Sequence, residues 1–224
     1  MTKIAIITAM ESEYNSILSL YDFQNIEGVA TAVTHGKIIE LIKSGIGKVN
    51  GALAANMACT RGADIVITTG LAGGIDALLN QGDCVLADNV CYHDVWCGSP
   101  NQIGQVQDFP LFFNSPKNML EKILSSAPKD YFKSGLTVTG DQFLTDANRL
   151  KEIKEQFPEA LAVDMESAAI AQACYINKRE FLSLRIISDV VGKQGQEDDY
   201  NNFWKNMPKK ASEMVDIVIK AIPA

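Results

Sequence analysis

"AVDMESAAIAQAC", residues 162–174, places two carboxylates, Asp164 and Glu166, inside a segment that is otherwise dominated by alanine and other apolar residues. An ionised carboxylate that is buried without partners is strongly destabilising. The pattern predicts a buried strand that ends near Asp164 and a helix that begins near Glu166. We expect the Asp164 side chain to be the N-cap that accepts backbone N–H groups of this helix. Glu166 is then expected at the carboxyl end of the strand, where open α/β sheets bind ligands.

The same alternation of apolar strands and helices runs along the whole chain. Strands are expected at residues 3–8, 29–34, 37–44, 64–70, 83–90, 135–140, 160–165 and 181–190. Helices are expected at residues 10–21, 48–62, 116–127, 147–157, 166–177 and 208–222. Unbroken apolar strands between helices predict a sheet that is covered on both faces. We therefore predict a single α/β domain over residues 1–224, with three α/β/α layers around a mixed, largely parallel, twisted sheet.

Composition narrows the class of function. The 224 residues carry a formal net charge of −7, and their Lys and Arg residues form no basic stripe, so neither nucleic acid nor an anionic membrane is an expected partner. No apolar run is long enough to cross a membrane, and the first residues lack a signal-peptide core. Five cysteines without a CxxC pair and only two histidines predict free thiols, no metal and no cofactor. The cytoplasm is the expected compartment.

Three carboxylates follow three separate predicted strands. Glu13 follows residues 3–8, Glu166 follows residues 160–165, and Asp189 lies near the end of residues 181–190. Glu11 cannot share a helix face with Glu13, so only one of these two is expected in the crevice. Desolvation is expected to raise the pKa of Asp189 and to favour its protonated form. One acid, one base and one hydroxyl-binding carboxylate suit the cleavage of a glycosidic bond.

Other interpretations of these residues stay open at this point. The acidic residues could be helix caps and the glycines turns, which would leave a plain α/β domain. Three carboxylates could also hold a divalent cation, although the apolar neighbours and the lack of a DxD pattern argue against it. The stretches "SGIGKVNG" (44–51) and "TGLAGG" (69–74) follow neither phosphate-loop pattern and favour tight turns.

Seven short motifs together resemble a known family. They are "AMESE" (9–13), "SGIGKVN" (44–50), "TGLAGG" (69–74), "YHD" (92–94), "TGDQF" (139–143), "AVDMESAAIA" (162–171) and "RIISDV" (185–190). Their order and spacing, over essentially the whole chain, resemble the purine nucleoside phosphorylase/uridine phosphorylase superfamily. Within it they are most similar to the 5′-methylthioadenosine/S-adenosylhomocysteine nucleosidase branch.

The resemblance implies a role for each carboxylate. Asp189 would protonate or hydrogen-bond N7 of the purine, so that adenine leaves as a neutral base. Glu13 would position and deprotonate the attacking water. Glu166 would bind the ribose hydroxyls, and Met165 would pack under the sugar. Arg185 would lie near the water site.

The resemblance also implies the remaining contacts of the substrate. Phe143 would stack on the base, and the backbone of Leu144 would bind its edge. Ser188 would support Asp189, and Tyr200 would close over the ligand. Leu71 stands where the nucleosidases usually carry a small hydroxyl residue, which removes one polar contact.

The stretch over residues 93–110 departs from the family at the pocket for the 5′ substituent. Trp96 and Phe109 are candidates for this pocket, with core packing the favoured role of Trp96. The phosphorylases of the superfamily bind phosphate with arginines, and "TAMESE" (8–13) and "ITTGLAGG" (67–74) contain none. A hydrolase acting on adenine nucleosides with a 5′-thio group is therefore expected.

A futalosine-type or 5′-deoxyadenosine hydrolase, a nucleoside phosphorylase and a non-catalytic nucleoside-binding protein remain the alternatives. The resemblance further implies a homodimer, with a nucleoside and water as the small-molecule partners.

Overall fold

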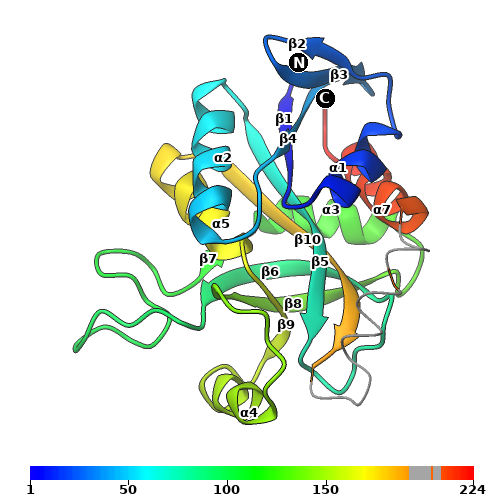
Figure 1. Ribbon diagram of the computed structural model, residues 1–224. Coiled ribbons are helices and arrows are strands. Elements are labelled where there is room, and N and C mark those ends of the chain that lie inside the picture. Colours follow the sequence, from blue (N-terminus) through cyan, green and yellow to red (C-terminus); the bar gives the residue numbers. More distant parts are fainter. Residues whose placement is uncertain (192–202, 204–207) are drawn as a thin grey trace.

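The computed structural model describes residues 1–191, 203 and 208–224, and Figure 1 shows their arrangement. The strands are β1 (Lys3–Thr8), β2 (Gln24–Ile26), β3 (Val29–Thr34), β4 (Lys37–Lys43), β5 (Ile65–Gly74), β6 (Cys84–Tyr92), β7 (Phe113–Asn114), β8 (Phe132–Thr139), β9 (Ala160–Asp164) and β10 (Glu180–Val190). The helices are α1 (Glu11–Leu18), α2 (Lys48–Thr60), α3 (Lys117–Ser126), α4 (Ala147–Gln156), α5 (Ser167–Asn177) and α7 (Pro208–Ala221). Tyr200, expected to close over a ligand, lies outside the described residues.

The described strands form one mixed sheet that closes on itself around β5. This strand pairs in parallel with β1 through its first residues and with β10 along its length, and it pairs antiparallel with β9 through Gly73 and Gly74. Pairings of β10 with β6, β6 with β8 and β8 with β9 complete a ring of five strands. Strands β1, β4, β3 and β2 extend from the ring. The carboxyl ends of β5 and β10 consequently lie together beside β9, and β1 ends alongside the middle of β5.

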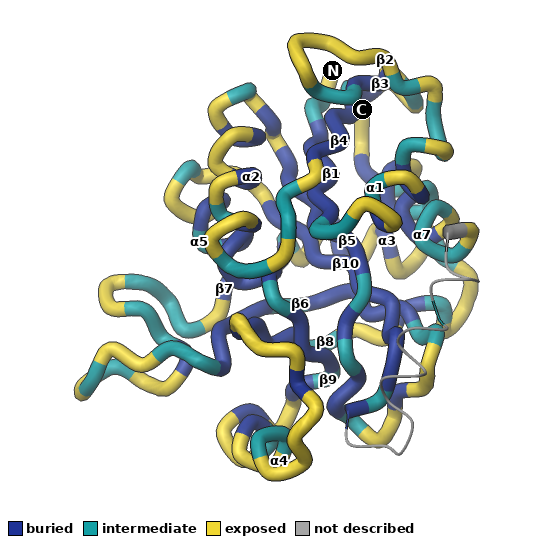
Figure 2. Tube along the Cα trace, in the orientation of Figure 1, coloured by how far each residue is buried: buried dark blue, intermediate teal, exposed yellow. Residues whose placement is uncertain are grey.

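Helices cover both faces of the sheet, as the alternating pattern predicts. In Figure 1, α2 and α5 lie together on one side, and α1, α3 and α7 lie on the other. The side chains of β1 show why both faces need cover. Ile4 and Ile6 belong to the core under α3 and α7, whereas Ala5 and Ile7 belong to the core under α2 and α5. The central strands are accordingly buried along their length in Figure 2. The predicted three-layer α/β fold is confirmed.

Some local expectations differ from the structure. The stretch 71–74 was expected to follow its strand as a turn, but it continues β5 because its backbone pairs with both β9 and β10. Trp96, expected to pack in the core, is 66% exposed because it lies in the irregular segment that follows β6.

Four cysteines are buried free thiols, and Cys97 is exposed. The described helices are too short or too polar to cross a membrane.

Candidate active site

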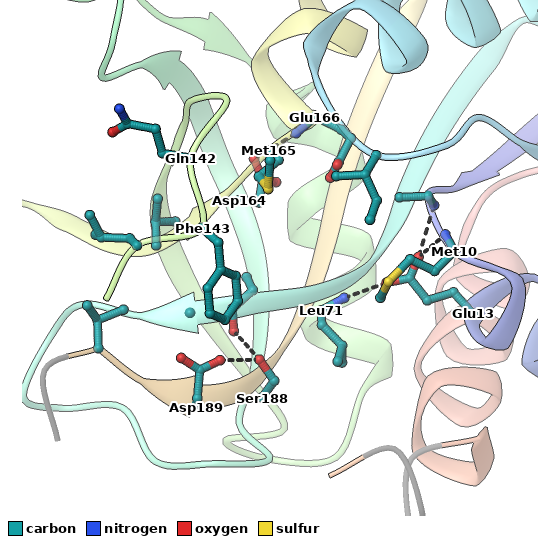
Figure 3. Close-up of a pocket in the computed structure, with 17 residues that line it drawn as sticks. Met10, Glu13, Leu71, Gln142, Phe143, Asp164, Met165, Glu166, Ser188 and Asp189 are labelled. Carbon is teal, nitrogen blue, oxygen red and sulfur yellow. Dashed lines mark hydrogen bonds between the residues drawn. The ribbon is translucent and has the colours of Figure 1, made fainter. Parts of the chain in front are cut away.

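A pocket opens where the carboxyl ends of the central strands meet (Figure 3). Its wall includes all three predicted carboxylates, which come from α1, the turn after β9, and β10. The lining residues are Ala9, Met10, Glu13, Ile46, Leu71, Ala72, Gly73, Gln142, Phe143, Leu144, Val163, Asp164, Met165, Glu166, Ser188, Asp189 and Val191. Residues separated by more than half of the chain thus share one cavity, because the ring of strands turns their ends toward one another.

Glu13 is held in the first turn of α1 by backbone N–H groups. Ala9 and Met10 donate to Oε2, each at 2.9 Å, and Leu71 of β5 donates to Oε1 at 3.0 Å. Burial raises the pKa of Glu13, while Arg185 and these N–H groups act to lower it. Glu11 instead pairs with Lys43 at the surface and does not line the pocket. Glu13 is therefore an oriented carboxylate whose proton affinity is enhanced, as a general base requires.

Glu166 occupies the N-cap position of α5 and faces the pocket (Figure 3). The Gly47 N–H donates to its Oε1 at 2.9 Å, and a guanidinium nitrogen of Arg185 lies 3.7 Å from its Oε2. Burial raises the pKa of Glu166 to about 7, against the attraction of Arg185 and with the repulsion of Asp164. Near neutral pH this carboxyl can thus be ionised or protonated, and a donor in the pocket would favour the ionised form.

Asp164 is stabilised mainly by a buried ion pair and only secondarily by the helix. Arg185 donates from Nε to its Oδ2 at 2.7 Å, and the Thr139 hydroxyl donates to its Oδ1 at 2.6 Å. The Ser167 N–H of α5 donates to Oδ1 at 3.2 Å. The expectation that Asp164 is the N-cap is wrong: Glu166 holds that position, because Met165 and Glu166 separate the end of β9 from the start of α5.

Arg185 lies behind the wall of the pocket, not on it. Its side chain is 2% exposed, and its guanidinium also donates to the hydroxyls of Thr68 and Ser167 at 3.1 and 3.0 Å. A Cβ added to Gly70 would lie 3.0 Å from Arg185 Nη1 and would collide with Glu13 Oε1, so the two charged groups approach each other on the side of β5 to which a side chain at Gly70 would point. Arg185 therefore lies between the pocket carboxylates and Asp164 without lining the pocket, and its predicted catalytic role stays a prediction.

Asp189 reaches the pocket from the opposite side (Figure 3). It is 2% exposed, and the neighbouring Ser188 hydroxyl donates a short hydrogen bond to its Oδ1. The same hydroxyl lies 3.2 Å from the carbonyl oxygen of Ala72. The predicted support of Asp189 by Ser188 is thus present as a contact, and it fixes which carboxyl oxygen faces the protein.

Apolar side chains and Gln142 form most of the remainder of the pocket. Phe143 is 51% exposed at the rim, whereas Leu144 is 5% exposed. Met165 and Leu71 also line the cavity, as the sequence indicated. Sequence reasoning missed Met10, Ile46 and Gln142, although each lies inside a quoted motif, because a motif does not reveal which of its side chains turn inward. Trp96 and Phe109 do not line this pocket in the described part of the chain.

The described lining contains no Lys, Arg or His. No group of three potential metal ligands occurs among the described residues either. The pocket therefore combines acidic groups with apolar walls, which suits a neutral ligand with hydroxyl groups and a transition state that gains positive charge.

Comparisons with known proteins agree with this geometry. The model of the family described as "Phosphorylase superfamily" matches residues 3–223. The chain belongs to the phosphorylase superfamily. Among superfamily members, it is 35% identical over 230 residues to the 5′-methylthioadenosine/S-adenosylhomocysteine nucleosidase of Lysinibacillus sphaericus, covering 98% of both chains. It is 36% identical, with the same coverage, to the nucleosidase of that name from Bacillus pumilus.

Solved structures of the phosphorylase superfamily superpose closely. The S. pneumoniae 5′-methylthioadenosine/S-adenosylhomocysteine nucleosidase with a transition-state inhibitor gives a TM-score of 0.92 at 31% identity, covering 99% of this chain and 100% of that one. A futalosine hydrolase mutant of Helicobacter pylori gives a TM-score of 0.90 at 25% identity, with the same coverage. Both proteins are named for a hydrolysis, and both share the fold of this chain.

Proposed function

We propose that the protein is an N-glycosyl hydrolase that cleaves adenine nucleosides carrying a 5′-thio substituent, 5′-methylthioadenosine and S-adenosylhomocysteine. The observation that carries this proposal is the convergence of Glu13, Glu166 and Asp189 on one pocket whose described lining holds no cation. The nucleosidases similar to this chain over its full length support the same substrate class.

The three carboxylates divide the reaction among them. Ser188 donates to Oδ1 of Asp189, so the acid proton belongs on Oδ2, which delivers it to N7 of adenine. The bond between C1′ and N9 breaks, its electron pair stays with the purine, and adenine leaves as a neutral base. Glu13 takes a proton from water as the water oxygen bonds to C1′. Glu166 binds the ribose hydroxyls, and its negative charge stabilises the oxocarbenium-like transition state.

The apolar residues place the nucleoside for this reaction. Phe143 stacks on the base from the rim, and the backbone of Leu144 binds the edge of adenine. Met165 packs under the ribose. The Leu71 N–H already donates to Glu13, so Leu71 contributes an apolar side chain to the pocket and a backbone contact to the base catalyst.

Hydrolysis is favoured over phosphorolysis by charge. A phosphate dianion would lie beside Glu13 and Glu166. The Arg185 guanidinium, 3.7 Å from Glu166 Oε2, is already engaged by Asp164, Thr68 and Ser167. Like charges in a buried site repel strongly. Water carries no net charge and is not repelled by Glu13 and Glu166.

The test is direct. Purified protein is mixed with 5′-methylthioadenosine, with and without phosphate, and free adenine and the sugar product are measured. We expect adenine and methylthioribose at the same rate in both mixtures. A phosphorylated sugar that forms only with phosphate would establish a phosphorylase. Tight binding without adenine release would establish a nucleoside-binding protein.

Futalosine is the second candidate substrate, because the H. pylori futalosine hydrolase shares this fold and 25% of its residues. Parallel assays with methylthioadenosine, S-adenosylhomocysteine, 5′-deoxyadenosine and futalosine compare kcat/KM. We expect the two thio-nucleosides to be preferred, and a preference for futalosine would assign the chain to the other chemistry.

We also propose a homodimer in the cytoplasm. Apolar side chains on the outer face of α2 are exposed, Val49 by 70%, Leu53 by 65% and Met57 by 41%, at intervals of four residues that align them in one row. An exposed apolar row of this kind is typical of a protein interface. The free cysteines suit a reducing compartment.

A further inference from the structure

A charged cluster outside the pocket joins the first residue of α2 to the segments that follow β6 and β8. The cluster consists of Lys48, Asp94 and Asp141, and none of the three lines the pocket. Lys48 Nζ lies 2.9 and 2.8 Å from the two carboxyl oxygens of Asp94 and 3.7 Å from Asp141 Oδ2. The ammonium group also lies 5.5 Å from the centre of the Tyr92 ring.

Backbone groups close the cluster into a ring of contacts. The Lys48 N–H donates to Asp141 Oδ1 at 2.8 Å, and the Asp141 N–H donates to Asp94 Oδ2 at 2.9 Å. Each of the three residues therefore contacts both of the others. Such charge-assisted, mutually supporting hydrogen bonds are stronger than isolated surface pairs. The Lys48 and Asp94 side chains are only 22% and 17% exposed, so solvent screens the pair incompletely.

Both ends of the cluster continue directly into the pocket. Gly47, the residue before Lys48, donates its N–H to Glu166 Oε1 at 2.9 Å. Asp141 precedes Gln142, Phe143 and Leu144, which line the pocket on the side of the base. A Cβ added to Gly47 would lie 3.1 Å from Asp141 Oδ1, so the two segments are in close contact.

We propose that Lys48 is a positioning residue, which through Asp94 and Asp141 fixes the Gly47 N–H on Glu166 and fixes the 141–144 segment beside the base. Its role in substrate affinity rests on the proposed function. Its effect on Glu166 does not, because that contact exists without any ligand.

The direction in which the pKa of Glu166 moves when Lys48 is removed follows from the groups that face Glu166. Arg185 of β10 and the Gly47 N–H favour its ionised form, while Asp164 of β9, Glu13 of α1 and burial disfavour it. Loosening Gly47 removes one of the two favourable contacts. The pKa of Glu166 must then rise, and more of the protein carries a protonated Glu166 near neutral pH.

The experiment compares Lys48→Met with Lys48→Arg, which keeps the charge, and with Lys151→Met, which removes a lysine that is 77% exposed on α4. In the ligand-free proteins, ¹³C NMR follows the titration of the Glu166 carboxyl, assigned with Glu166→Gln. We expect the midpoint to move upward in Lys48→Met, to return toward the wild-type value in Lys48→Arg, and to stay unchanged in Lys151→Met. An unchanged midpoint in a folded Lys48→Met protein would overturn the proposal.

Kinetics with methylthioadenosine provide the second readout. We expect KM to rise about tenfold in Lys48→Met while kcat changes much less, and we expect the KM difference to shrink as the pH is raised. A fall in kcat alone would overturn the assignment. If Lys48→Met does not fold, Asp94→Asn, which keeps the shape of the cluster, is measured by the same two criteria. Failure of the wild-type protein to release adenine would refute the proposed function, whereas the NMR titration would still decide the effect on Glu166.

Discussion

At Glu166, burial opposes ionisation, and the Arg185 guanidinium and the Gly47 N–H favour it. Burial prevails and raises its pKa from 4.5 to about 7. Between these two pH values the folded protein holds a proton on Glu166 that the unfolded chain releases. The free energy of unfolding must therefore fall as the pH rises through this range, by an amount on the order of 3 kcal/mol for this group.

Glu166→Gln removes this titration. We predict that the free energy of unfolding, measured with urea, is similar in the variant and the wild type near pH 4.5. Up to about pH 7 the variant should become increasingly more stable than the wild type. Other carboxyls titrate in both proteins, so the difference between the two curves isolates Glu166. A difference that is independent of pH would show that the folded-state pKa of Glu166 is ordinary.

Asp189 is expected to act through its proton, and an amide of the same shape tests this. The Oδ1 atom of an asparagine at this position can still accept the hydrogen bond from the Ser188 hydroxyl, but asparagine cannot protonate N7. We predict that Asp189→Asn lowers kcat by about 10²- to 10⁴-fold at unchanged thermal stability. Asp130→Asn is the control, since Asp130 is exposed and has a left-handed backbone that asparagine also adopts. Nearly wild-type kcat in Asp189→Asn would refute the acid role.

The residues that sequence reasoning placed well are carboxylates at or shortly after the end of an apolar strand. Glu13, Glu166 and Asp189 were all recognised in this way, because the period of the pattern fixes where the strands end. The partner of Asp164 was not recognised. In the sequence Arg185 is one more cation. Its ion pair with Asp164 joins two strands, β9 and β10, that are not neighbours in the sheet, so periodicity cannot reveal it.

At the scale of elements, α1 and β10 approach each other at β5 because Gly70 of this strand has no side chain. The space that a Cβ of Gly70 would fill is occupied by Glu13 Oε1, and Arg185 Nη1 lies 3.0 Å from the same position. We predict that Gly70→Ala displaces Glu13 and lowers kcat toward the value of Glu13→Gln, with a smaller effect on affinity for a non-hydrolysable nucleoside analogue. Steady-state kinetics and calorimetry measure the two quantities.

A double variant decides whether Gly70 acts through Glu13. In the Glu13→Gln background, Gly70→Ala should cost little further activity, because the group that it displaces no longer takes a proton. Full additivity of the two effects on kcat would instead mean that Gly70→Ala disturbs β5 as a whole.

Most strand and helix positions were predicted, but the short strands β2 and β7 and the closure of the sheet were not. The pattern of residues 64–74 suggested a strand and then a glycine turn. The observed β5 continues through Gly73 and Gly74 because two strands, β9 and β10, pair with its last residues. Hydrogen bonds to strands that lie far away in the chain leave no trace in local composition, so the ring of β5, β10, β6, β8 and β9 could not be inferred from it.

For the molecule as a whole, this ring explains how one pocket gathers residues 13, 166 and 189. An open sheet would leave the end of β9 beside only its immediate neighbours. Closure brings β9 against the end of β5, where β10 also ends, and Glu13 of α1 reaches the same strand at Leu71. The apolar row on α2 lies outside that enclosed structure, and burial against helices of the same chain does not account for it.

A second copy of the chain would bury the row, and a charge placed in it tests this at the scale of the assembly. Val49 on α2 and Val33 on β3 are equally exposed, each by 70%, so Val49→Arg and Val33→Arg make a matched pair. We predict that light scattering after size-exclusion chromatography finds a dimer in the wild type and in Val33→Arg, and a monomer in Val49→Arg, because an unpaired guanidinium within an apolar interface is strongly unfavourable. A dimer that survives Val49→Arg would place the interface elsewhere, and a monomeric wild-type protein would refute the assembly itself.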